Sequence, residues 1–486
     1  MIVPYCPGTP LAIEEREIGG ATVQEPTIAA LDKFLSRSRQ VQDRLARVPV
    51  EERLEVFDRL GRLWYEQVSA GKHDGLRASM ARTTNYSDEL LETEMTFVAA
   101  VLGRTNLEEN LEASLRGGAA ALERFTDVGE LEYYMHRPAG PVLIVASGNS
   151  IVPVLIPTVL SLVTGNMTFL KPSLANYEGV HAVLGQLESL PASEARDAIR
   201  DALCIAYLRS DGPVLDHALA AAGFGVVNFW GGEPARGSVA QKVARNPHRP
   251  KFFANGPMTG VAMVHADAAS EDNADGLAMN MVLYDQQLCS SPTCAVFVGD
   301  HSAALDFAKR TAAHLDEDGA AQPMKIDEGT LFSLQNFRRT LQVRGGTVLS
   351  GRSQDNAWTI CVSKGKGVMD LALVQYPHMG LHARRRFLEL ISVPSIDDAL
   401  GIIRTLPQQK AYAGIDRVQT VGLAVPDGME DEVSQKLAEA GAFRILPVGD
   451  MYMRSSLEPY DGVAMASLFT YIAYRRSRSI DLEEQL

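Results

Sequence analysis

A cysteine in a polar turn is the residue with the clearest capacity for chemistry. The stretch YDQQLCSSPTCAVFV, residues 284–298, holds Cys289 after two glutamines and before Ser290-Ser291-Pro292. A cysteine nucleophile reacts as its thiolate, so it must be partly accessible and must lie where the anion is favoured. A loop between a helix and a strand is a common place for such a group. The local sequence leaves two interpretations open, a catalytic nucleophile and an inert loop thiol.

The other cysteines indicate no second chemistry. Cys294 lies inside the apolar run that follows, where we expect it to pack in a core. The pair does not predict a zinc site, because four intervening residues are at the wide end of zinc-ligand spacings and no second Cys/His pair lies nearby. We therefore expect no metal. Five cysteines without framework spacing are typical of a reduced protein; they are Cys6, Cys204, Cys289, Cys294 and Cys361.

Three further segments place polar groups or glycines directly after strand-like runs. VASGNSIVP sets Asn149 between a strand and a helix, at the edge where open α/β sheets bind ligands. Its amide could donate to an oxyanion, although a turn asparagine is the simpler local interpretation. FLKPS ends a strand at Lys171, and NFWGGEPARG sets Gly231-Gly232 before a helix whose N-terminus favours phosphate. Neither G-x-G-x-x-G nor a P-loop pattern is present, so the local phosphate signal is weak.

Composition indicates an acidic globular protein. The chain has 486 residues, of which 46% are hydrophobic and 22% charged, and a net charge of −14. This balance argues against nucleic acid or an anionic membrane as the main partner. We expect the densest basic cluster, residues 384–386, to lie on a solvated helix face.

No segment predicts a membrane span or a signal peptide. The most apolar region, residues 141–170, is interrupted by glycines, prolines and asparagines, whereas a span needs about 20 uninterrupted apolar residues. The N-terminal stretch MIVPYCPGTPLAIEERE lacks a basic region followed by an apolar core. We expect a cytoplasmic protein.

Hydrophobic periodicity predicts the elements that must position these residues. From about residue 26 to 125 the pattern is helical, with Leu54, Phe57, Leu60 and Trp64 at spacings of three and four. From residue 131 short apolar strands alternate with helices, which indicates βαβ units and a parallel, doubly wound sheet.

A second alternating region begins near Pro257. Its expected strands are GVAMVH, CAVFVG, WTICV, LALVQY, FLELISV, TVGLAV and FRILPV, and GVAMASLFTYIAYRR is expected to be a final helix. The predicted fold class is α/β, with two doubly wound, Rossmann-like domains in tandem and a helical N-terminal region. The predicted domains are residues 1–256 for cofactor binding, 257–447 for catalysis, and 448–486 for a tail and helix that return to the cofactor domain or form a subunit interface.

Taken in order, these pieces resemble the aldehyde dehydrogenase superfamily. The matches cover about residues 140–400: Asn149, KPS at 171–173, FWGG at 229–232, ANGP at 254–257, QLC at 287–289 and ISVPSIDDAL. Within the superfamily, DQQLCSSP, WGG after a strand and the late Asp461-Gly462 look like the LuxC-type acyl-CoA reductases. These enzymes reduce activated fatty acids to aldehydes with NADPH.

The resemblance implies a role for each matching residue. It implies that Cys289 is the nucleophile, and that the Asn149 amide and the Cys289 backbone N–H stabilise the oxyanion of a tetrahedral intermediate. It also implies a site for NADPH, with NADH possible. The implied cofactor-binding residues are Ser147, Lys171, Ser173, Gly231 and Gly232.

Three departures from the superfamily pattern bear on function. FFANGP, residues 252–257, has no glutamate to activate water, so an acyl-enzyme should hydrolyse slowly and react with a thiol or a hydride. The acid expected on the nicotinamide ribose is absent, and RRRFLELISV has Arg386 or Glu389 instead. Leu174 follows KPS in place of a carboxylate for the ribose 2′-hydroxyl, which favours NADPH.

The resemblance predicts NAD(P)H-dependent reduction of an acyl thioester to an aldehyde through an acyl-cysteine on Cys289. The expected partners are an acyl-CoA, an acyl-carrier protein or an acyl-transferring enzyme, and we expect a homo-oligomer. Three alternatives stay open. One is an aldehyde dehydrogenase that works in the oxidative direction. Another is a non-catalytic scaffold that binds an acyl carrier. The third, a phosphate-activated semialdehyde dehydrogenase, would need a basic pocket that the sequence does not locate.

Overall fold

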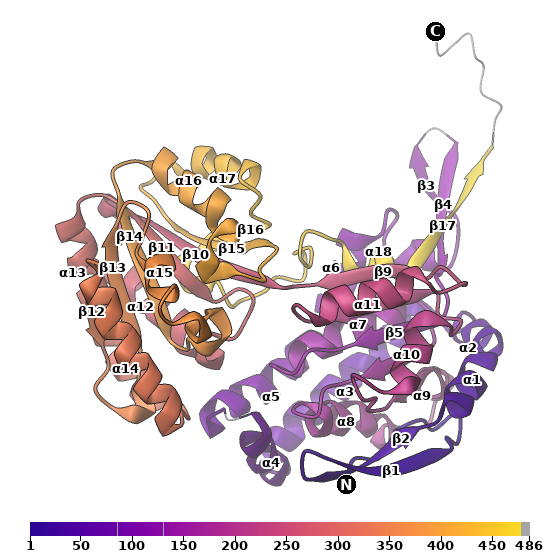
Figure 1. The fold of residues 1–486 in the computed structure, drawn as a ribbon. Helices are drawn as coiled ribbons and strands as arrows, with labels where there is room; N and C mark the ends of the chain where they lie inside the picture. The colour runs from indigo at the N-terminus through magenta and orange to yellow at the C-terminus, as the bar shows by residue number, and fades with distance from the viewer. Residues whose placement is uncertain (85, 130, 478–486) are drawn as a thin grey trace. The chain divides into compact units, whose positions relative to one another are not determined.

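The computed structural model describes residues 1–84, 86–129 and 131–477, which form two compact units (Figure 1). Unit 1 contains residues up to Thr84, from Glu92 to Asn255 and from Ser455 onward. Unit 2 contains residues 86–91 and Gly256–Arg454. Each unit is built on its own sheet.

Unit 1 begins with a hairpin and a helical region. Strands β1 (Ile13–Ile18) and β2 (Ala21–Pro26) pair antiparallel. The predicted stripe on α3, from Leu54 to Trp64, is fully buried, which confirms that its spacing marks the inner face of a helix. The helices of this region are α1 (Ile28–Ser36), α2 (Ser38–Leu45), α3 (Val50–Ser69), α4 (Asp74–Thr84), α5 (Asp88–Leu102) and α6 (Arg104–Ser114).

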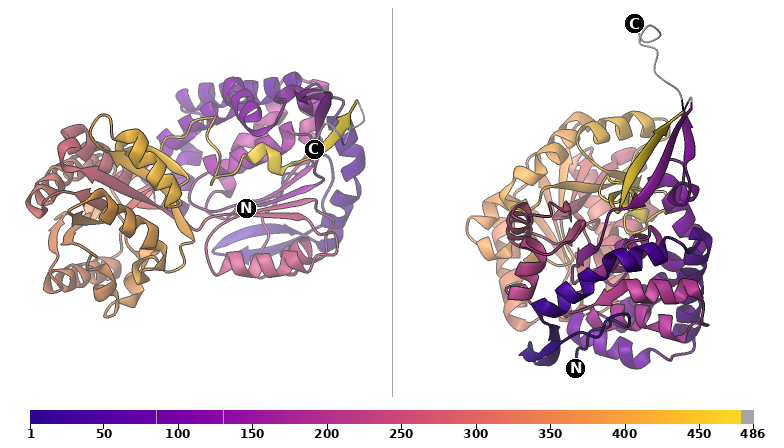
Figure 2. Two further views of the ribbon diagram at one scale, coloured as in Figure 1. Left: turned by 90° about the horizontal axis from the view of Figure 1, so that it is seen from above. Right: turned by 90° about the vertical axis from the view of Figure 1, so that its right-hand side faces the viewer.

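A parallel five-stranded sheet forms the core of unit 1, and helices lie on both of its faces (Figure 2). Its strand order is β7 (Leu203–Ile205), β6 (Thr168–Lys171), β5 (Val142–Val145), β8 (Val226–Trp230) and β9 (Lys251–Asn255). The chain leaves β5 toward β6 and later returns to its other side at β8, so the strand order reverses there. In a doubly wound sheet the carboxyl ends at this reversal form the ligand crevice. The connecting helices are α7 (Val152–Val163), α8 (Tyr177–Gly185), α9 (Glu194–Ala202), α10 (Pro213–Ala220) and α11 (Ala235–Ala244).

Unit 2 is built on a seven-stranded sheet. The order is β12 (Thr347–Ser350), β13 (Thr359–Lys364), β14 (Phe387–Val393), β11 (Pro292–Val298), β10 (Met258–His265), β15 (Arg417–Ala424) and β16 (Arg444–Pro447). All neighbours are parallel except β12 and β13. Alternate residues of β10 enter separate apolar clusters on the two faces, which explains its continuous hydrophobic sequence. The helices are α12 (Glu271–Val282), α13 (His301–Ala321), α14 (Glu328–Val343), α15 (Met369–Leu373), α16 (Ile396–Thr405) and α17 (Glu430–Glu439).

Two predicted elements are wrong. LALVQY is not a strand, because Met369, Ala372 and Leu373 are buried at helical spacing and residues 369–373 form α15. The expected final helix is only the short α18 (Met465–Leu468), after which β17 (Thr470–Arg476) pairs antiparallel with β4 (Glu132–Pro138). Strand β3 (Thr126–Gly129) completes that sheet. The β-branched and aromatic residues of TYIAY suit such a pleated surface better than a helix.

The basic cluster at residues 384–386 is also not a solvated helix face. Arg384 and Arg386 are buried, and this segment runs directly into β14. The Arg384 guanidinium donates to the carbonyl of Ala411 and lies 6.0 Å from the centre of the Tyr412 ring. Cys294 is fully buried, as expected for a packing residue, and so is Cys361. Within the described ranges, no helix combines the length and the apolar composition needed to cross a membrane.

Candidate active site

Cys289 lies in a tight turn of unit 2, between the segment Leu283–Gln286 that follows α12 and strand β11. The backbone N–H of Ser291 donates to the carbonyl of Leu288 at 3.1 Å, so Cys289 occupies the second position of that turn. Its side chain is partly exposed, in contrast to the buried Cys294 five residues later. The turn therefore presents a thiol and does not bury it.

Residues 284–286, which precede Gln287 and the turn, have an unusual backbone conformation. Tyr284, Asp285 and Gln286 have φ values of 53°, 48° and 63°, the left-handed region that non-glycine residues rarely adopt. Such strain persists only where the surrounding structure determines it, and it is concentrated at functional sites. The conformation of this segment therefore requires anchors.

Side chains of the strained segment supply these anchors. The buried Asp285 pairs with the buried Arg386, with 2.9 Å between Oδ1 and Nε. The Gln286 amide bonds to both backbone groups of Phe387 and donates to the carbonyl of Pro292 at 2.6 Å. Since Phe387 begins β14, these bonds join the cysteine turn to the centre of the sheet.

Gly260 on β10 allows the segment after Cys289 to approach the sheet closely. A Cβ at this position would lie 2.1 Å from the carbonyl oxygen of Ser290. The Gly260 N–H donates to the carbonyl of Ser291 at 3.1 Å. Any larger residue would displace the turn that carries the thiol.

Gln419 on β15 contacts the thiol, and our sequence reasoning missed it. Its Nε2 lies 3.1 Å from Cys289 Sγ, and its side chain is completely buried. The sequence does indicate that Gln419 is unusual, because it is a single amide inside the apolar run RVQTVGLAV and a buried amide needs polar partners. Its neighbours in the chain do not indicate that the partner is Cys289.

The predicted residues of unit 1 lie together at one edge of its sheet. In the parallel register Val145 pairs with both Lys171 and Phe229, so β5, β6 and β8 end at the same level. Ser147 and Asn149 follow β5, Ser173 follows β6, and Gly231-Gly232 follow β8. This edge contains the reversal of strand order. The structure thus brings together all the predicted cofactor residues and Asn149, whereas Cys289 belongs to unit 2.

Local hydrogen bonds orient Asn149 and its loop. The Ser147 hydroxyl donates to Asn149 Oδ1 at 2.8 Å, which directs the other end of that amide away from Ser147. Asn176 Nδ2 donates to the carbonyls of Ser147 and Ser150 at 2.8 and 3.1 Å. The Ser173 hydroxyl donates in turn to Asn176 Oδ1 at 2.9 Å. Ser173 therefore supports the Asn149 loop through Asn176.

Glu94 on α5 holds the same loop from inside unit 1. Its carboxylate accepts hydrogen bonds from the Ser150 hydroxyl and, at 2.5 Å, from the backbone N–H of Ile151, just before α7. The side chain is almost completely buried, and desolvation raises the pKa of Glu94 to about 7. Sequence reasoning missed this residue, because the helical start showed no chemistry.

Lys171 is a buried ammonium. Desolvation lowers the pKa of Lys171 to about 8, and its Nζ lies 5.4 Å from the centre of the Tyr207 ring. No carboxylate in the described part of the chain forms an ion pair with it. A buried cation of this kind fits an anionic or hydroxyl-rich ligand such as the adenosine end of a nicotinamide nucleotide.

The glycines after β8 and the N-terminus of α11 are the expected site for a pyrophosphate, but some of their backbone N–H groups already have protein partners. The Gly231 N–H donates to the carbonyl of Asn255 at 3.1 Å. At the N-terminus of α11, Glu233 Oε2 accepts from the Gly237 N–H at 3.1 Å. A carboxylate thus already occupies part of the helix end that would attract a pyrophosphate.

The FFANGP motif, residues 252–257, contains an amide, Asn255, and no carboxylate. Asn255 Nδ2 donates to Asp461 Oδ2 at 2.7 Å, and Asn255 Oδ1 accepts from Asn228 Nδ2 at 2.9 Å. The late Asp461-Gly462 pair therefore has a structural partner in this motif. Arg386 and Glu389 do not present groups to a ribose. Arg386 pairs with Asp285, and the buried Glu389 accepts from the backbone N–H of Val368 at 2.6 Å.

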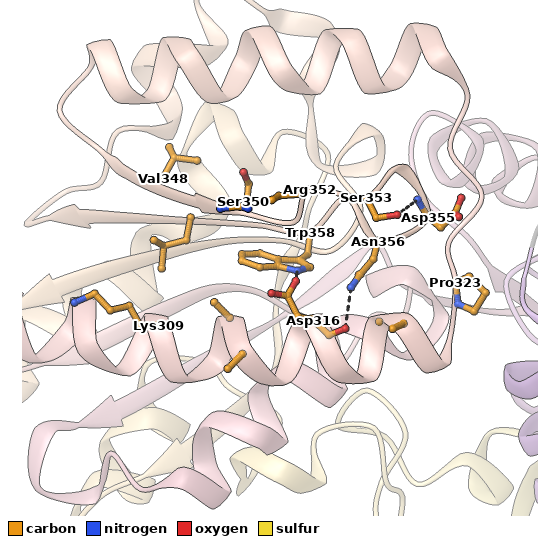
Figure 3. A pocket seen from close by; sticks show the side chains of 15 residues that line it. Lys309, Asp316, Pro323, Val348, Ser350, Arg352, Ser353, Asp355, Asn356 and Trp358 are labelled. Carbon is orange, nitrogen blue, oxygen red and sulfur yellow. Dashed lines mark hydrogen bonds between the residues drawn. The ribbon is translucent and has the colours of Figure 1, made fainter.

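A cavity of about 1060 Å³ lies elsewhere in unit 2, between α13 and residues 348–358 (Figure 3). None of the predicted site residues lines it. Its wall includes Asn356, whose Oδ1 accepts from Arg386 Nη1 at 3.1 Å. The cavity therefore lies beside Arg386, which anchors the segment before the cysteine turn, and Cys289 does not line it.

Comparisons with known proteins agree on family and fold. A family model described as acyl-CoA reductase (LuxC) matches residues 45–471. A curated long-chain acyl-protein thioester reductase from Aliivibrio fischeri is 22% identical over 342 residues, which cover 68% of this chain and 67% of that protein.

Solved structures show the fold. A NAD-dependent benzaldehyde dehydrogenase from Corynebacterium glutamicum superposes with a TM-score of 0.64 at 13% identity, covering 96% of this chain and 95% of the other. A glyceraldehyde-3-phosphate dehydrogenase from Methanocaldococcus jannaschii, solved with NADP, gives a TM-score of 0.67 at 11% identity, covering 93% and 95%. The chain has the aldehyde dehydrogenase fold, and the predicted α/β class is confirmed.

Proposed function

The chain belongs to the acyl-CoA reductase (LuxC) family, and we propose that it reduces an acyl thioester to an aldehyde through an acyl-cysteine on Cys289. The observation that carries this proposal is the cysteine turn. A network of buried hydrogen bonds holds a partly exposed thiol beside an amide donor. The name of the curated relative, an acyl-protein thioester reductase, supports the same class of reaction.

The first half of the proposed reaction is acyl transfer. The Cys289 thiolate attacks the thioester carbonyl, and a carbon–sulfur bond forms. The Asn149 amide and the Cys289 backbone N–H donate to the resulting oxyanion, and loss of one such donor typically costs about a hundred- to a thousandfold in rate. Collapse of the intermediate breaks the original thioester bond and releases the donor thiolate, which takes a proton from solvent.

The second half is reduction. The residues at the sheet edge of unit 1 would hold NAD(P)H, which would supply a hydride to the acyl carbon and become NAD(P)+. The same donors then stabilise the thiohemiacetal oxyanion, whose collapse breaks the bond to Cys289 Sγ, releases the aldehyde and restores the thiolate. The FFANGP motif, residues 252–257, has no glutamate to activate water, which supports reduction over hydrolysis of the acyl-enzyme.

The residues at the sheet edge of unit 1 fit the cofactor. We assign Lys171, with Ser147 and Ser173, to the adenosine ribose side, and Gly231-Gly232 with α11 to the pyrophosphate. Leu174 favours NADPH, because it leaves no carboxylate at that position to repel a 2′-phosphate.

Our proposal extends to organisation and partners. Residues 1–256 would bind the cofactor, 257–447 would carry catalysis, and 448–486 would return to the cofactor domain or form a subunit interface. We propose a cytoplasmic homo-oligomer that receives its acyl group from acyl-CoA, an acyl-carrier protein or a partner enzyme.

Intact mass spectrometry tests the proposal. Wild-type protein and the Cys289→Ala and Cys6→Ala variants are incubated with acyl-CoAs and with acyl-carrier protein, without NADPH. Cys6 is the matched control, since it is also a partly exposed free thiol. The wild type and Cys6→Ala should gain the acyl mass, and NADPH should discharge it as aldehyde. An adduct that forms equally on Cys289→Ala, or no adduct from either class of donor, would overturn the proposal.

A further inference from the structure

Gln419 lies at a one-residue irregularity in the sheet of unit 2. Between β10 and β15 the pairing passes from Thr259–Val418 to Gly260–Thr420, so the register shifts by one residue at Gln419. This is a β-bulge, a feature that redirects a side chain and is common beside active sites. The bulge therefore explains how an amide on a central strand can point at a turn beyond it.

A chain of hydrogen bonds fixes which end of this amide faces the thiol. The buried Arg444 donates from Nη1 to Thr420 Oγ1 at 2.8 Å. The Thr420 hydroxyl donates to Gln419 Oε1 at 3.2 Å. Because the side-chain oxygen of Gln419 accepts from Thr420, its side-chain NH₂ group is the end that faces Cys289, with Nε2 3.1 Å from Sγ. Successive bonds in such a chain polarise one another in the same sense.

We propose that Gln419 is a catalytic residue whose amide donates a hydrogen bond to the Cys289 thiolate, with Thr420 and Arg444 as positioning residues. When the thiol ionises, its proton passes to solvent and the anion keeps the Gln419 bond. The bond weakens as sulfur shares its electron pair with the acyl carbon. It forms again when the aldehyde leaves and the electron pair returns to sulfur.

The inference rests on the proposed function only for the identity of the nucleophile. Charged groups on the neighbouring elements have partners of their own: Asp285 with Arg385 and Arg386, Asp416 with Arg417, and Arg444 with Thr420. Gln419, in contrast, contacts Sγ directly. A neutral donor at that place lowers the pH at which the thiolate forms without adding a charge.

Alkylation of Cys289 by iodoacetamide tests the inference without substrate or cofactor. The rate at Cys289 is followed by peptide mass across pH in the wild type, Gln419→Met and Thr420→Val. Methionine has nearly the shape of glutamine but cannot donate. The alkylation midpoint, the pH at which the rate reaches half its plateau value, should rise by about one to two pH units in Gln419→Met. This shift corresponds to the free energy of one hydrogen bond to a charged group. Thr420→Val should shift it in the same direction by less.

A second signature separates this role from a purely structural one. A thiolate of higher pKa is intrinsically more nucleophilic, so the rate at the high-pH plateau should rise in Gln419→Met even as the midpoint moves. Below the midpoint the two effects combine to slow alkylation by about three- to tenfold. Gln435→Met, on the exposed face of α17, is the matched control and should leave the whole profile unchanged.

The outcomes are distinct. An alkylation midpoint in Gln419→Met and Thr420→Val that equals the wild-type midpoint would overturn the inference. A fall in the plateau without a shift in midpoint would also overturn it, because that result indicates lost packing. A shifted midpoint together with no acyl adduct from any thioester would support the role of Gln419 and refute the proposed function.

Discussion

At the scale of single residues, Lys171 carries a charge that depends on pH near neutrality. Burial lowers its pKa to about 8, so the side chain is an ammonium below that pH and becomes neutral above it. If this ammonium contacts the cofactor as we propose, NADPH affinity should be constant below about pH 8 and should fall at higher pH, by up to about tenfold per unit. Fluorescence titration of NADPH from pH 6.5 to about 9.5 measures this dependence.

Two variants complete that test. Lys171→Met should bind NADPH more weakly at pH 7 and should lose the pH dependence, because the titrating group is gone. Lys436→Met, on the exposed surface of α17, should behave as the wild type. A wild-type profile retained in Lys171→Met would show that another group titrates and that Lys171 does not hold the cofactor.

The residues that the sequence predicted and those it missed differ in how their partners are specified. Cys289, Asn149 and Lys171 stand in short motifs, and chain neighbours place them in the turn before β11, in the loop after β5 and at the end of β6. Gln419 lies 130 residues from Cys289, and its reach depends on a one-residue bulge that no hydrophobic pattern reveals. Glu94 is a similar case, because its partners Ser150 and Ile151 lie more than fifty residues away in the sequence, just before another helix, α7.

At the scale of elements, Glu94 joins α5 to the start of α7. Because burial raises the pKa of Glu94 to about 7, the folded protein binds this proton more tightly than the unfolded chain does. The carboxyl therefore contributes most stability below about pH 4.5, and this contribution declines as pH rises to 7. The total change is about 3 kcal/mol. Urea unfolding at several pH values should show the decline in the wild type.

Glu94→Gln isolates this contribution. The neutral amide can still accept from Ser150 and Ile151, so the decline between pH 4.5 and 7 should flatten by roughly the same amount. Glu92→Gln, an exposed change on the same helix, should keep the wild-type slope. If Glu94→Gln retained the slope, the pH dependence of unit 1 would have to arise from other groups.

The ion pair between Asp285 and Arg386 anchors the strained segment to β14. Burial raises the pKa of Asp285 and lowers that of Arg386, which shows that desolvation of the pair is substantial. Arg386→Met should cost about 3–5 kcal/mol of unfolding free energy, because the Asp285 charge would stay buried without its main partner. It should also slow acylation of Cys289, since the left-handed backbone would lose its support.

The unfolding free energies of three variants test this account. Asp285→Asn combined with Arg386→Met should recover part of the stability, because no unpaired charge is then buried. Arg417→Met, which removes an exposed pair with Asp416, should cost less than about 1 kcal/mol. Equal losses from Arg386→Met and Arg417→Met would contradict the anchoring role.

Element prediction succeeded where burial imposes a clear pattern. The central strands of both sheets are buried on both faces, and their continuous apolar runs between helices predicted the α/β class. Prediction failed at α15 and β17, which are short or lie at an edge. There the same apolar residues suit either structure, and the outcome depends on a partner such as β4 that is distant in the sequence.

At the scale of the whole molecule, the sheet of β3, β4 and β17 bears on the proposed homo-oligomer. Strand β17 lies at the edge of this sheet, beside β4 in Figure 1, and Tyr471, Ile472 and Tyr474 are about half exposed. An exposed apolar edge strand is a site where another chain can add. We therefore expect a second copy of the chain to cover it.

Charge on that strand should separate the copies without unfolding them. Ile472→Lys with Tyr474→Lys should lower the molar mass measured by light scattering to that of one chain, while urea unfolding of the monomer changes little, because both side chains are exposed. Lysine is a residue that natural proteins use to block such edges.

Val343→Lys with Phe332→Lys, exposed apolar positions on α14, is the matched control. A mass that both double variants leave unchanged would mean that oligomers, if they form, use another surface. A mass that falls only in the α14 variant would place the interface on unit 2.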